Sequence, residues 1–392
     1  MTPTLNNSSD TSKPWATFRA KPEDFLVEEI SAYEPSGSGE HLYVRFRKRG
    51  LTTLQAVADL ARRLGAQGRD AGTAGLKDRH AVTVQTASFP WPMARPLPEA
   101  EALGSEGLEV LSLARHGNKL RTGHLRGNRF VIVLRELEPS ALEGLASAFE
   151  RLGEVGVPNW FGPQRFGRDG DNAEQARAWL SGRVPAPRQP RVRRLQFSAL
   201  QSELFHRVLE RRVADGSWRE PREGDLAQRE GGGPLRTWPL VEREGYEPRR
   251  DARDEGGGEL IPGEESAWRP TGPMYGSRVR WPTGPSGELE REVLASALGD
   301  GALLDRWSTL GEGARRVLAL TPRRLRAGPT AEEGPSGLRV EFMLPKGAYA
   351  TTVLGALCQL RDASARPNRA EGDGGGGAAA GADDGACEEE LA

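Results

Sequence analysis

Cysteine is nearly absent from this chain. Only Cys358 and Cys387 occur among its 392 residues, and two cysteines cannot form a disulfide framework or a cysteine-rich, four-ligand zinc site. Proteins without structural disulfides are typical of reducing compartments. We therefore expect a cytoplasmic protein.

Long apolar runs are also missing. The longest strongly apolar run, Phe130 to Leu134, is far shorter than the roughly eighteen residues that would cross a bilayer. The N-terminal segment, Met1 to Trp15, is polar and has neither the basic start nor the apolar stretch of a signal peptide. We expect neither export nor a membrane partner.

Three common catalytic motifs do not occur in the chain: the phosphate loop GxxxxGK[ST], the zinc motif HExxH and the nucleophile elbow GxSxG. His116 and His124 have no cysteine or carboxylate near enough in the sequence to complete a metal site. We therefore expect no metal, no nucleotide cofactor and no other cofactor.

The net charge is small but unevenly distributed. Residues 371–392 contain seven acidic residues and no lysine or arginine, so the formal charge of -1 combines a tail of -7 with a body of +6. A cationic body is consistent with a polyanionic partner. Residues 1–14 and 363–392 are predicted to be disordered, and residues 244–266 to form a loop, because they offer little apolar surface to bury.

Hydrophobic periodicity predicts alternating strands and helices. Residues 42–47 place leucine, valine and phenylalanine on one face and tyrosine and two arginines on the other, which indicates a half-buried strand. A helix is predicted from an N-cap at Thr52 or Thr53 to a C-terminal glycine. Strands are also predicted at 130–134 and 338–344. This pattern indicates an α+β protein.

One carboxylate lies among cations at a predicted loop tip. In the segment AGLKDRHAVTVQ, Asp78 stands between Lys77 and Arg79. Cationic neighbours favour the ionised form of a carboxylate, which a nucleophile or general base requires. The alternative is a solvated surface turn with no chemistry.

A basic segment runs from His116 to Arg135. It holds several cations, no acid, and glycines that let a backbone approach closely, a combination that suits phosphates. The alternative is a solvated charged face. The cations of this segment are Lys119, Arg121, Arg126, Arg129 and Arg135.

An aromatic segment, VPNWFGPQRFGRDG, follows at Val157 to Gly170 and places Trp160, Phe161 and Phe166 around Arg165 and Arg168. Aromatic rings interleaved with arginine can stack on unpaired bases and bind the flanking phosphates. The same aromatics could equally form a corner of the hydrophobic core.

Taken in order, these segments resemble the signature blocks of the TruD family of pseudouridine synthases. The resemblance rests on PEDFLVEE, GEHLYVRFRKRGLTT, AGLKDRHAVTVQ, HGNKLRTGHLRGNRF, VPNWFGPQRFG, the stretch from Phe197 to Arg211, and FMLPKGAYATTVL. It covers about Ala16 to Arg361. Several blocks in order are far more specific than any one motif, and they favour the catalytic interpretation of Asp78.

The resemblance implies a pseudouridine synthase catalytic domain, with a mixed sheet and flanking helices, interrupted by an inserted TRUD α/β domain. We expect the catalytic domain at 15–155 and 311–362 and the inserted domain at 156–310. The family isomerises uridine 13 of certain tRNAs to pseudouridine, so tRNA is the expected partner. The resemblance says nothing of protein partners.

Site residues follow from positions that match the family blocks. Asp78 matches the catalytic carboxylate and Arg19 the cation that pairs with it, while Phe25, Asn128 and Tyr349 match substrate-contacting positions. Further cations are expected to bind RNA. These are Lys77, Arg79, Lys119, Arg126, Arg129 and Arg165.

The chain departs from the family pattern at two positions. Tyr349 stands where phenylalanine is expected, and it keeps an aromatic face for stacking. His206 stands where asparagine is usual, which changes a local hydrogen bond but not the expected chemistry.

Isomerisation of uridine needs no cofactor and no net redox change, in agreement with the missing cofactor motifs. The target base must leave its stack, and phosphate contacts and an aromatic sandwich of Phe25 and Tyr349 would offset that cost. Two alternatives stay open: a non-catalytic RNA-binding protein of the same fold, and a hydrolase that cleaves the glycosidic bond and releases uracil.

Overall fold

The computed structural model describes residues 13–167, 169–240, 260–261, 266–299, 309–330 and 336–364. The predicted disordered ends and the predicted loop at 244–266 lie mostly outside these ranges. No helix in the described part of the chain is long and apolar enough to cross a membrane. The chain is an α+β protein, as predicted.

The chain divides into two compact units. The sheet unit contains residues 14–150, most of 324–347 and residues from 358, and the helical unit contains most of 151–323 and residues 348–357. The expected inserted domain, 156–310, falls within the helical unit, which also takes in 311–323 and 348–357. The domain limits given above remain a prediction.

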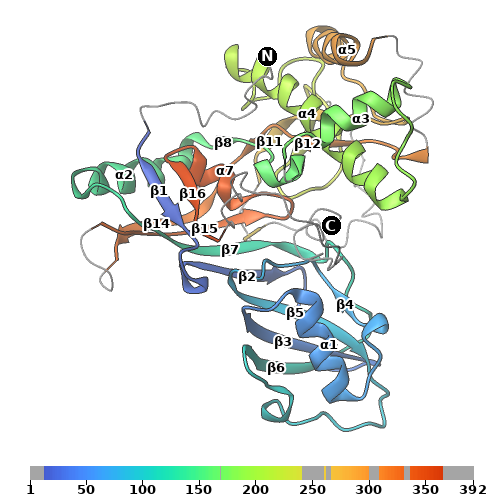
Figure 1. The fold of residues 1–392 in the computed structure, drawn as a ribbon, viewed down its shortest axis with the longest axis vertical. Helices are drawn as coiled ribbons and strands as arrows, with labels where there is room; N and C mark the ends of the chain where they lie inside the picture. Colours follow the sequence, from blue (N-terminus) through green and yellow to red (C-terminus); the bar gives the residue numbers. More distant parts are fainter. Residues whose placement is uncertain are drawn as a thin grey trace, which may run out of the picture. The chain divides into compact units, whose positions relative to one another are not determined.

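The sheet unit is built on an eight-stranded mixed sheet with the order β14-β15-β7-β2-β5-β3-β6, with β4 added at β5 (Figure 1). The pair β2–β5 is parallel, whereas β15–β7, β2–β7, β3–β5 and β3–β6 are antiparallel. A two-stranded parallel pair, β1 with β16, joins the two ends of this unit. The strands are β1 (Trp15–Phe18), β2 (Phe25–Ser31), β3 (His41–Arg49), β4 (Gly72–Thr73), β5 (Val82–Pro90), β6 (Leu108–His116), β7 (Leu125–Leu134), β14 (Arg323–Pro329), β15 (Leu338–Pro345) and β16 (Gln359–Asp362).

Helix α1 (Thr53–Leu64) confirms the predicted strand–helix pair. Thr52 caps its first turn by accepting a hydrogen bond from the backbone N–H of Gln55, and Gly65 ends it in the left-handed region at φ 61°. The apolar face of α1 packs on the leucine, valine and phenylalanine of β3, all fully buried. Figure 1 shows the helix lying against this part of the sheet. Burial of this shared apolar surface fixes which face of the sheet the helix covers.

Sheet register places several polar side chains on the same face as α1. Lys48 is paired with Thr83 across β3 and β5, and Glu29 is paired with Asn128 across β2 and β7. Directly paired residues point to the same side of a sheet, and side chains alternate along each strand. Phe25, four residues before Glu29 on β2, therefore shares this face as well.

Tyr43 lies on the face of its strand opposite Leu42, as predicted, but it is more buried than a half-buried strand implies. The reason is non-local, because His116 and Tyr33 cover it and its hydroxyl donates to the backbone carbonyl of Asn118 at 3.0 Å. Alternation along one strand cannot predict such a cover from a distant segment.

The helical unit has its core around α4 (Pro190–Ala214), against which α3 and α5 pack. A four-stranded sheet, with the order β10-β9-β11-β12, and the short pair β8–β13 complete it. The other elements are α3 (Asn172–Leu180), α5 (Gly284–Leu298), α7 (Ala350–Gly355), β8 (Val157–Pro158), β9 (Leu226–Arg229), β10 (Arg236–Thr237), β11 (Trp268–Met274), β12 (Ala314–Val317) and β13 (Ala319–Leu320). Helix α2 (Leu142–Val155) connects the chain of the sheet unit to that of the helical unit.

Short 3-10 helices occupy several turns. They are Pro22–Asp24, Gly68–Asp70, Glu101–Leu103, Pro139–Ala141 and Pro163–Phe166. The first leads directly into β2 and holds Asp24, a buried carboxylate that is bonded to Arg135. This bond fixes the entry to the strand that carries Phe25 and Glu29.

Candidate active site

Asp78 lies in the loop between β4 and β5, on the sheet unit. Its Oδ2 forms an ion pair with a guanidinium nitrogen of Arg19 at 2.6 Å, and its Oδ1 accepts a hydrogen bond from the backbone N–H of His80 at 2.9 Å. About 20% of the side chain is exposed. The carboxylate is thus held by two donors and still open to a ligand.

Arg19 is positioned by an unusual backbone. It directly follows β1 and has a φ of 57°, in the left-handed region that few non-glycine residues adopt. Its guanidinium lies 4.3 Å from the centre of the Phe25 ring, and it contacts Asp362 at 3.4 Å in addition to Asp78. The aromatic ring and the two carboxylates account for where this cation lies.

The Phe25 ring packs against the guanidinium of Arg19. The ring is only 4% exposed and also packs against Phe18 and Phe130. In this arrangement most of the Phe25 ring is in contact with protein. Its expected role in stacking on a base remains a prediction, and the contact that the structure gives it is with Arg19.

Lys77, next to Asp78, reaches in another direction. Its ammonium donates to Oδ1 of Asn128 at 2.7 Å and forms an ion pair with Oε1 of Glu29 at 3.3 Å. The backbone N–H of Lys77 donates to the hydroxyl of Thr53 at 2.8 Å, which ties the loop to the start of α1. Asp78 contacts Arg19, which lies over the Phe25 ring, and Lys77 contacts Asn128. These two consecutive loop residues therefore join the three side chains into one cluster on one face of the sheet.

Lys48 is a residue of this cluster that the sequence interpretation missed. It is fully buried, and its ammonium donates to the backbone carbonyls of Asp78 at 2.7 Å and Leu51 at 2.8 Å. A signal was present, since Lys48 is in phase with the apolar face of its strand rather than with the arginines. A lysine on a buried face is rare unless its charge is engaged.

Replacing Lys48 with methionine should lower the rate of any reaction that depends on Asp78 by about 10²-fold, because a displacement of the Asp78 loop by about 1 Å is enough to cost that much. Methionine keeps the apolar stem but leaves the two carbonyls without this donor. Single-turnover rates at saturating protein, corrected for the folded fraction, measure the effect. Arg47→Met, at the neighbouring position on the exposed face where Arg47 pairs with Glu109, is the matched control and should be nearly silent.

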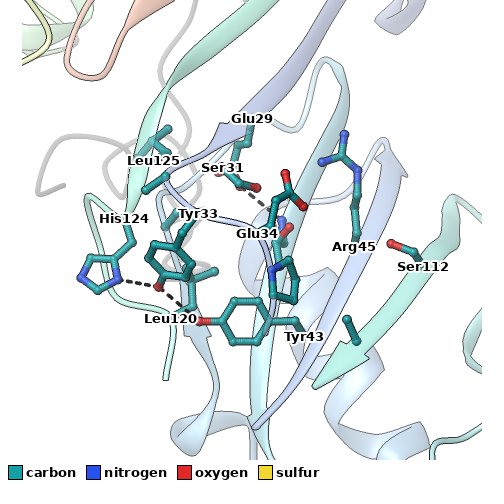
Figure 2. Close-up of a pocket in the computed structure, with 15 residues that line it drawn as sticks. Glu29, Ser31, Tyr33, Glu34, Tyr43, Arg45, Ser112, Leu120, His124 and Leu125 are labelled. Carbon is teal, nitrogen blue, oxygen red and sulfur yellow. Dashed lines mark hydrogen bonds between the residues drawn. The ribbon is translucent and has the colours of Figure 1, made fainter. Parts of the chain in front are cut away.

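A pocket is lined in part by Glu29, which also pairs with Lys77 of this cluster. Figure 2 shows the residues that line the pocket, Glu29 among them. The Tyr33 hydroxyl bonds to Nδ1 of His124 at 2.9 Å and to the Tyr43 hydroxyl at 3.2 Å. Burial raises the pKa of Tyr43, so its hydroxyl stays protonated. These bonds hold the basic segment around His124 against β3 and the residues that follow β2.

The expected RNA-binding cations of the sheet unit differ in their contacts. Arg79 is exposed, and its Nε donates to the carbonyl of Gly50. Lys119 and Arg126 are half-buried. Arg129 contacts two carboxylates, Glu341 at 2.8 Å and Glu28 at 3.2 Å, and the Glu341 contact is the main reason that its pKa is raised.

Tyr349 belongs to the helical unit, immediately before α7. Its ring packs edge-on against Phe161, 6.1 Å between centres, and the Arg316 guanidinium lies 4.1 Å from the Phe161 ring and 6.0 Å from the Tyr349 ring. Arg165 also lies over Phe161, and its Nε donates to the hydroxyl of Ser202. The aromatic segment is therefore largely core, and its Arg165 lies over the Phe161 ring, while Arg168 lies outside the described residues.

His206 has a structural role in the same cluster. Its Nε2 accepts a hydrogen bond from the backbone N–H of Phe161 at 2.7 Å. Burial lowers the pKa of His206 to about 3, so the ring is neutral and able to accept. His206 therefore serves as a neutral hydrogen-bond acceptor within the core of the helical unit.

In the described ranges, no three histidine, cysteine or carboxylate side chains are grouped so that they could hold a metal ion. What the Asp78 cluster offers is an accessible carboxylate, a paired cation, an amide and a buried lysine that fixes the loop. Such a set can supply an anionic nucleophile or base and a hydrogen-bond donor.

Comparison with known proteins identifies relatives along nearly the whole chain. The family model "tRNA pseudouridine synthase D (TruD)" matches residues 8–178 and 187–356. The tRNA pseudouridine synthase D of Anaeromyxobacter dehalogenans is 43% identical over 344 residues, covering 86% of this chain and 91% of the relative. That of Xanthomonas axonopodis pv. citri is 36% identical over 367 residues, covering 89% and 92%.

A solved structure from Methanosarcina mazei, assigned to tRNA pseudouridine synthase D (TruD), has a similar fold. Its TM-score is 0.65 at 24% identity, and the match covers 91% of this chain and 96% of that one. At this identity the likeness concerns the fold alone.

Proposed function

The chain belongs to the tRNA pseudouridine synthase D (TruD) family, and on that premise we propose that it isomerises uridine 13 of tRNA, with Asp78 as the catalytic carboxylate. The family assignment makes it an isomerase. The position of the uridine and the identity of the carboxylate are the proposal.

The reaction is an exchange of one bond for another. The bond from ribose C1' to uracil N1 breaks and a bond from C1' to C5 forms, while C5 loses a proton and N1 gains one. Atoms and electrons balance without an oxidant or a cofactor. The carboxylate must be ionised whether it attacks the nucleoside or removes a proton.

The observation that best supports Asp78 is its ion pair with Arg19 at 2.6 Å while about a fifth of the side chain stays exposed. The Arg19 side chain is 9% exposed, so the cation is largely withdrawn from water while the carboxylate keeps some access to solvent. Electrostatic stabilisation of an accessible carboxylate is the arrangement that such a reaction needs.

Phe25 and Asn128 of the sheet unit are proposed to contact the extruded uridine, Phe25 through its ring and Asn128 through its amide. The role of Tyr349, in the helical unit, stays a prediction from the family pattern. Removing a base from its stack costs a few kcal/mol of free energy, and contacts of this kind offset that cost. The proposal extends the family pattern to this chain, residue by residue.

A tRNA transcript incubated with the purified protein tests the function. We expect pseudouridine at position 13, detected by chemical mapping and by mass spectrometry of nucleosides, and no conversion when that uridine is replaced by cytidine. Release of free uracil would instead identify a hydrolase. Tight binding without conversion would identify a non-catalytic RNA-binding protein.

Affinity for tRNA should fall steeply with salt, because lysine and arginine side chains displace counterions from phosphates. The slope of log affinity against log salt is about -0.7 for each phosphate contact on single strands. Lys119→Gln and Arg126→Gln should each reduce the slope by about that amount. A flat salt response would contradict the proposed role of the basic segment.

Three of the other proposed RNA-binding cations should have smaller effects on that slope. Lys77, Arg129 and Arg165 already contact side-chain acceptors within their own units, whereas Arg79 and Arg126 donate to backbone carbonyls through Nε. Binding isotherms at several salt concentrations would rank them. If substitution of Arg129 changed the salt slope as much as substitution of Lys119, an internal ion pair would not prevent a cation from binding RNA.

A further inference from the structure

The Asn128 amide is held in one orientation. The ammonium of Lys77 can only donate hydrogen bonds, and it lies 2.7 Å from Oδ1 of Asn128. The amide oxygen must therefore face Lys77, which leaves the Nδ2 donors on the other side. Asparagine on its own could present either end of its amide to a ligand, and Lys77 removes that freedom.

Lys77 is itself fixed in place. Its ammonium is also paired with Glu29, whose side chain is 4% exposed and whose second oxygen accepts from the backbone N–H of Thr86 at 3.2 Å. Glu29 lies directly opposite Asn128 in the sheet register. The orientation of the amide therefore depends on a buried acid, a loop lysine and the register of two strands.

The Nδ2 donors of Asn128 have no acceptor in the parts of the chain that the structure describes. Asn128 forms one recorded side-chain hydrogen bond, through Oδ1, and its Nδ2 is not among the buried polar atoms that lack a partner. A donor with no protein acceptor that is not fully enclosed is available to a ligand.

We propose that Lys77 and Asn128 together select uracil over cytosine, with Nδ2 of Asn128 donating to the carbonyl oxygen at C4 of the target base. This inference rests on the proposed function. The two pyrimidines differ at C4, where uracil carries an oxygen acceptor and cytosine an amino donor. A flipped base is identified through hydrogen bonds to this edge.

The most direct test exchanges the hydrogen-bond donor of the Asn128 side chain for an acceptor. Asn128→Asp keeps an oxygen for Lys77 and replaces the Nδ2 donor with an acceptor, so the variant should favour the amino group of cytosine. Affinities are measured for two tRNA transcripts that differ only in uridine or cytidine at position 13. An Asp78→Asn background prevents conversion during the measurement.

With Asn128 present, uridine should be preferred by about 10-fold to 100-fold, the usual discrimination from one well-placed contact to a base edge. Asn128→Asp should bring the ratio to one or invert it. Lys77→Met should reduce the preference without inverting it, because the freed amide can turn either way. The comparison of ratios cancels the cost of unstacking and the phosphate contacts, which both transcripts share.

Asn118→Asp is the matched control. It introduces the same change of charge at an exposed position of the same unit, so it should lower both affinities and leave the ratio unchanged. An unchanged ratio in Asn128→Asp would overturn the inference, provided that the wild-type protein converts uridine. Failure of the wild-type protein to convert any uridine would instead overturn the proposed function.

Discussion

Asp78→Asn should abolish pseudouridine formation, with the single-turnover rate reduced on the order of 10⁴-fold or more, as for the loss of an essential nucleophile. The amide is nearly the size of the carboxylate but cannot act as an anion. A loss of that size exceeds what disturbed positioning accounts for, which is about 10²-fold. Conversion of a labelled tRNA at saturating protein measures it directly, and tRNA affinity should change little.

The folded fraction of this variant must be measured as well. Asp78 accepts from both Arg19 and the N–H of His80, and an asparagine has one oxygen for these two donors. A modest loss of thermal stability is therefore expected. Rates are compared per folded molecule, so that this loss is not taken for a catalytic effect.

Asp362→Asn is the appropriate control, since Asp362 is the second carboxylate on the Arg19 guanidinium, at 3.4 Å. It removes the same charge from the same cation and should cost less than about 10-fold, because it leaves the proposed catalytic group in place. If Asp78→Asn kept a tenth of the wild-type rate, Asp78 could not be the nucleophile and the RNA-binding alternative would be favoured.

Local elements were largely predictable from the sequence. The strand–helix pair ending at Gly65 follows from alternation, a threonine cap and a C-terminal glycine, all of which depend on neighbours within a few residues. The buried strands β7 and β15 follow from short apolar runs with the same logic. These elements are predictable because each one depends mainly on its own apolar face and on the residues at its own ends.

The polar cluster was predictable only through the family resemblance. Asp78 and Asp362 are almost three hundred residues apart in the sequence, and they meet on one guanidinium only because β1 pairs with β16. No local pattern encodes that pairing. Asp362 was accordingly assigned no role, whereas its neighbour in space, Asp78, matched a family block.

Composition could show that a segment is basic but not which cations are engaged. The basic segment holds Lys119 and Arg129 ten residues apart, and composition does not distinguish them. The fold places Arg129 on β7, where it contacts two carboxylates, one from β2 and one from β15. A cation's availability therefore depends on its sheet neighbours, which sequence spacing does not give.

Arg19→Met should reduce the rate by about 10²-fold to 10³-fold, the usual loss when one preorganised electrostatic contact is removed. Methionine can still cover the Phe25 ring, so the change removes charge more than packing. The variant also leaves Asp78 and Asp362 without the cation that they share, so their mutual repulsion adds to the loss. Arg19→Lys keeps the charge and should retain more activity than Arg19→Met.

The decisive measurement for Arg19 is a double-mutant cycle with Asp78→Asn. If Arg19 acts only through the carboxylate that it contacts at 2.6 Å, then Arg19→Met should cost almost nothing once Asp78 is already asparagine, because effects of residues that act as a unit are not additive. Residual rates in the two backgrounds, each corrected for the folded fraction, give the coupling. Two full, additive losses would show that Arg19 contributes independently of Asp78, for example by contacting the RNA itself, and its assignment as the partner of the catalytic carboxylate would then be wrong.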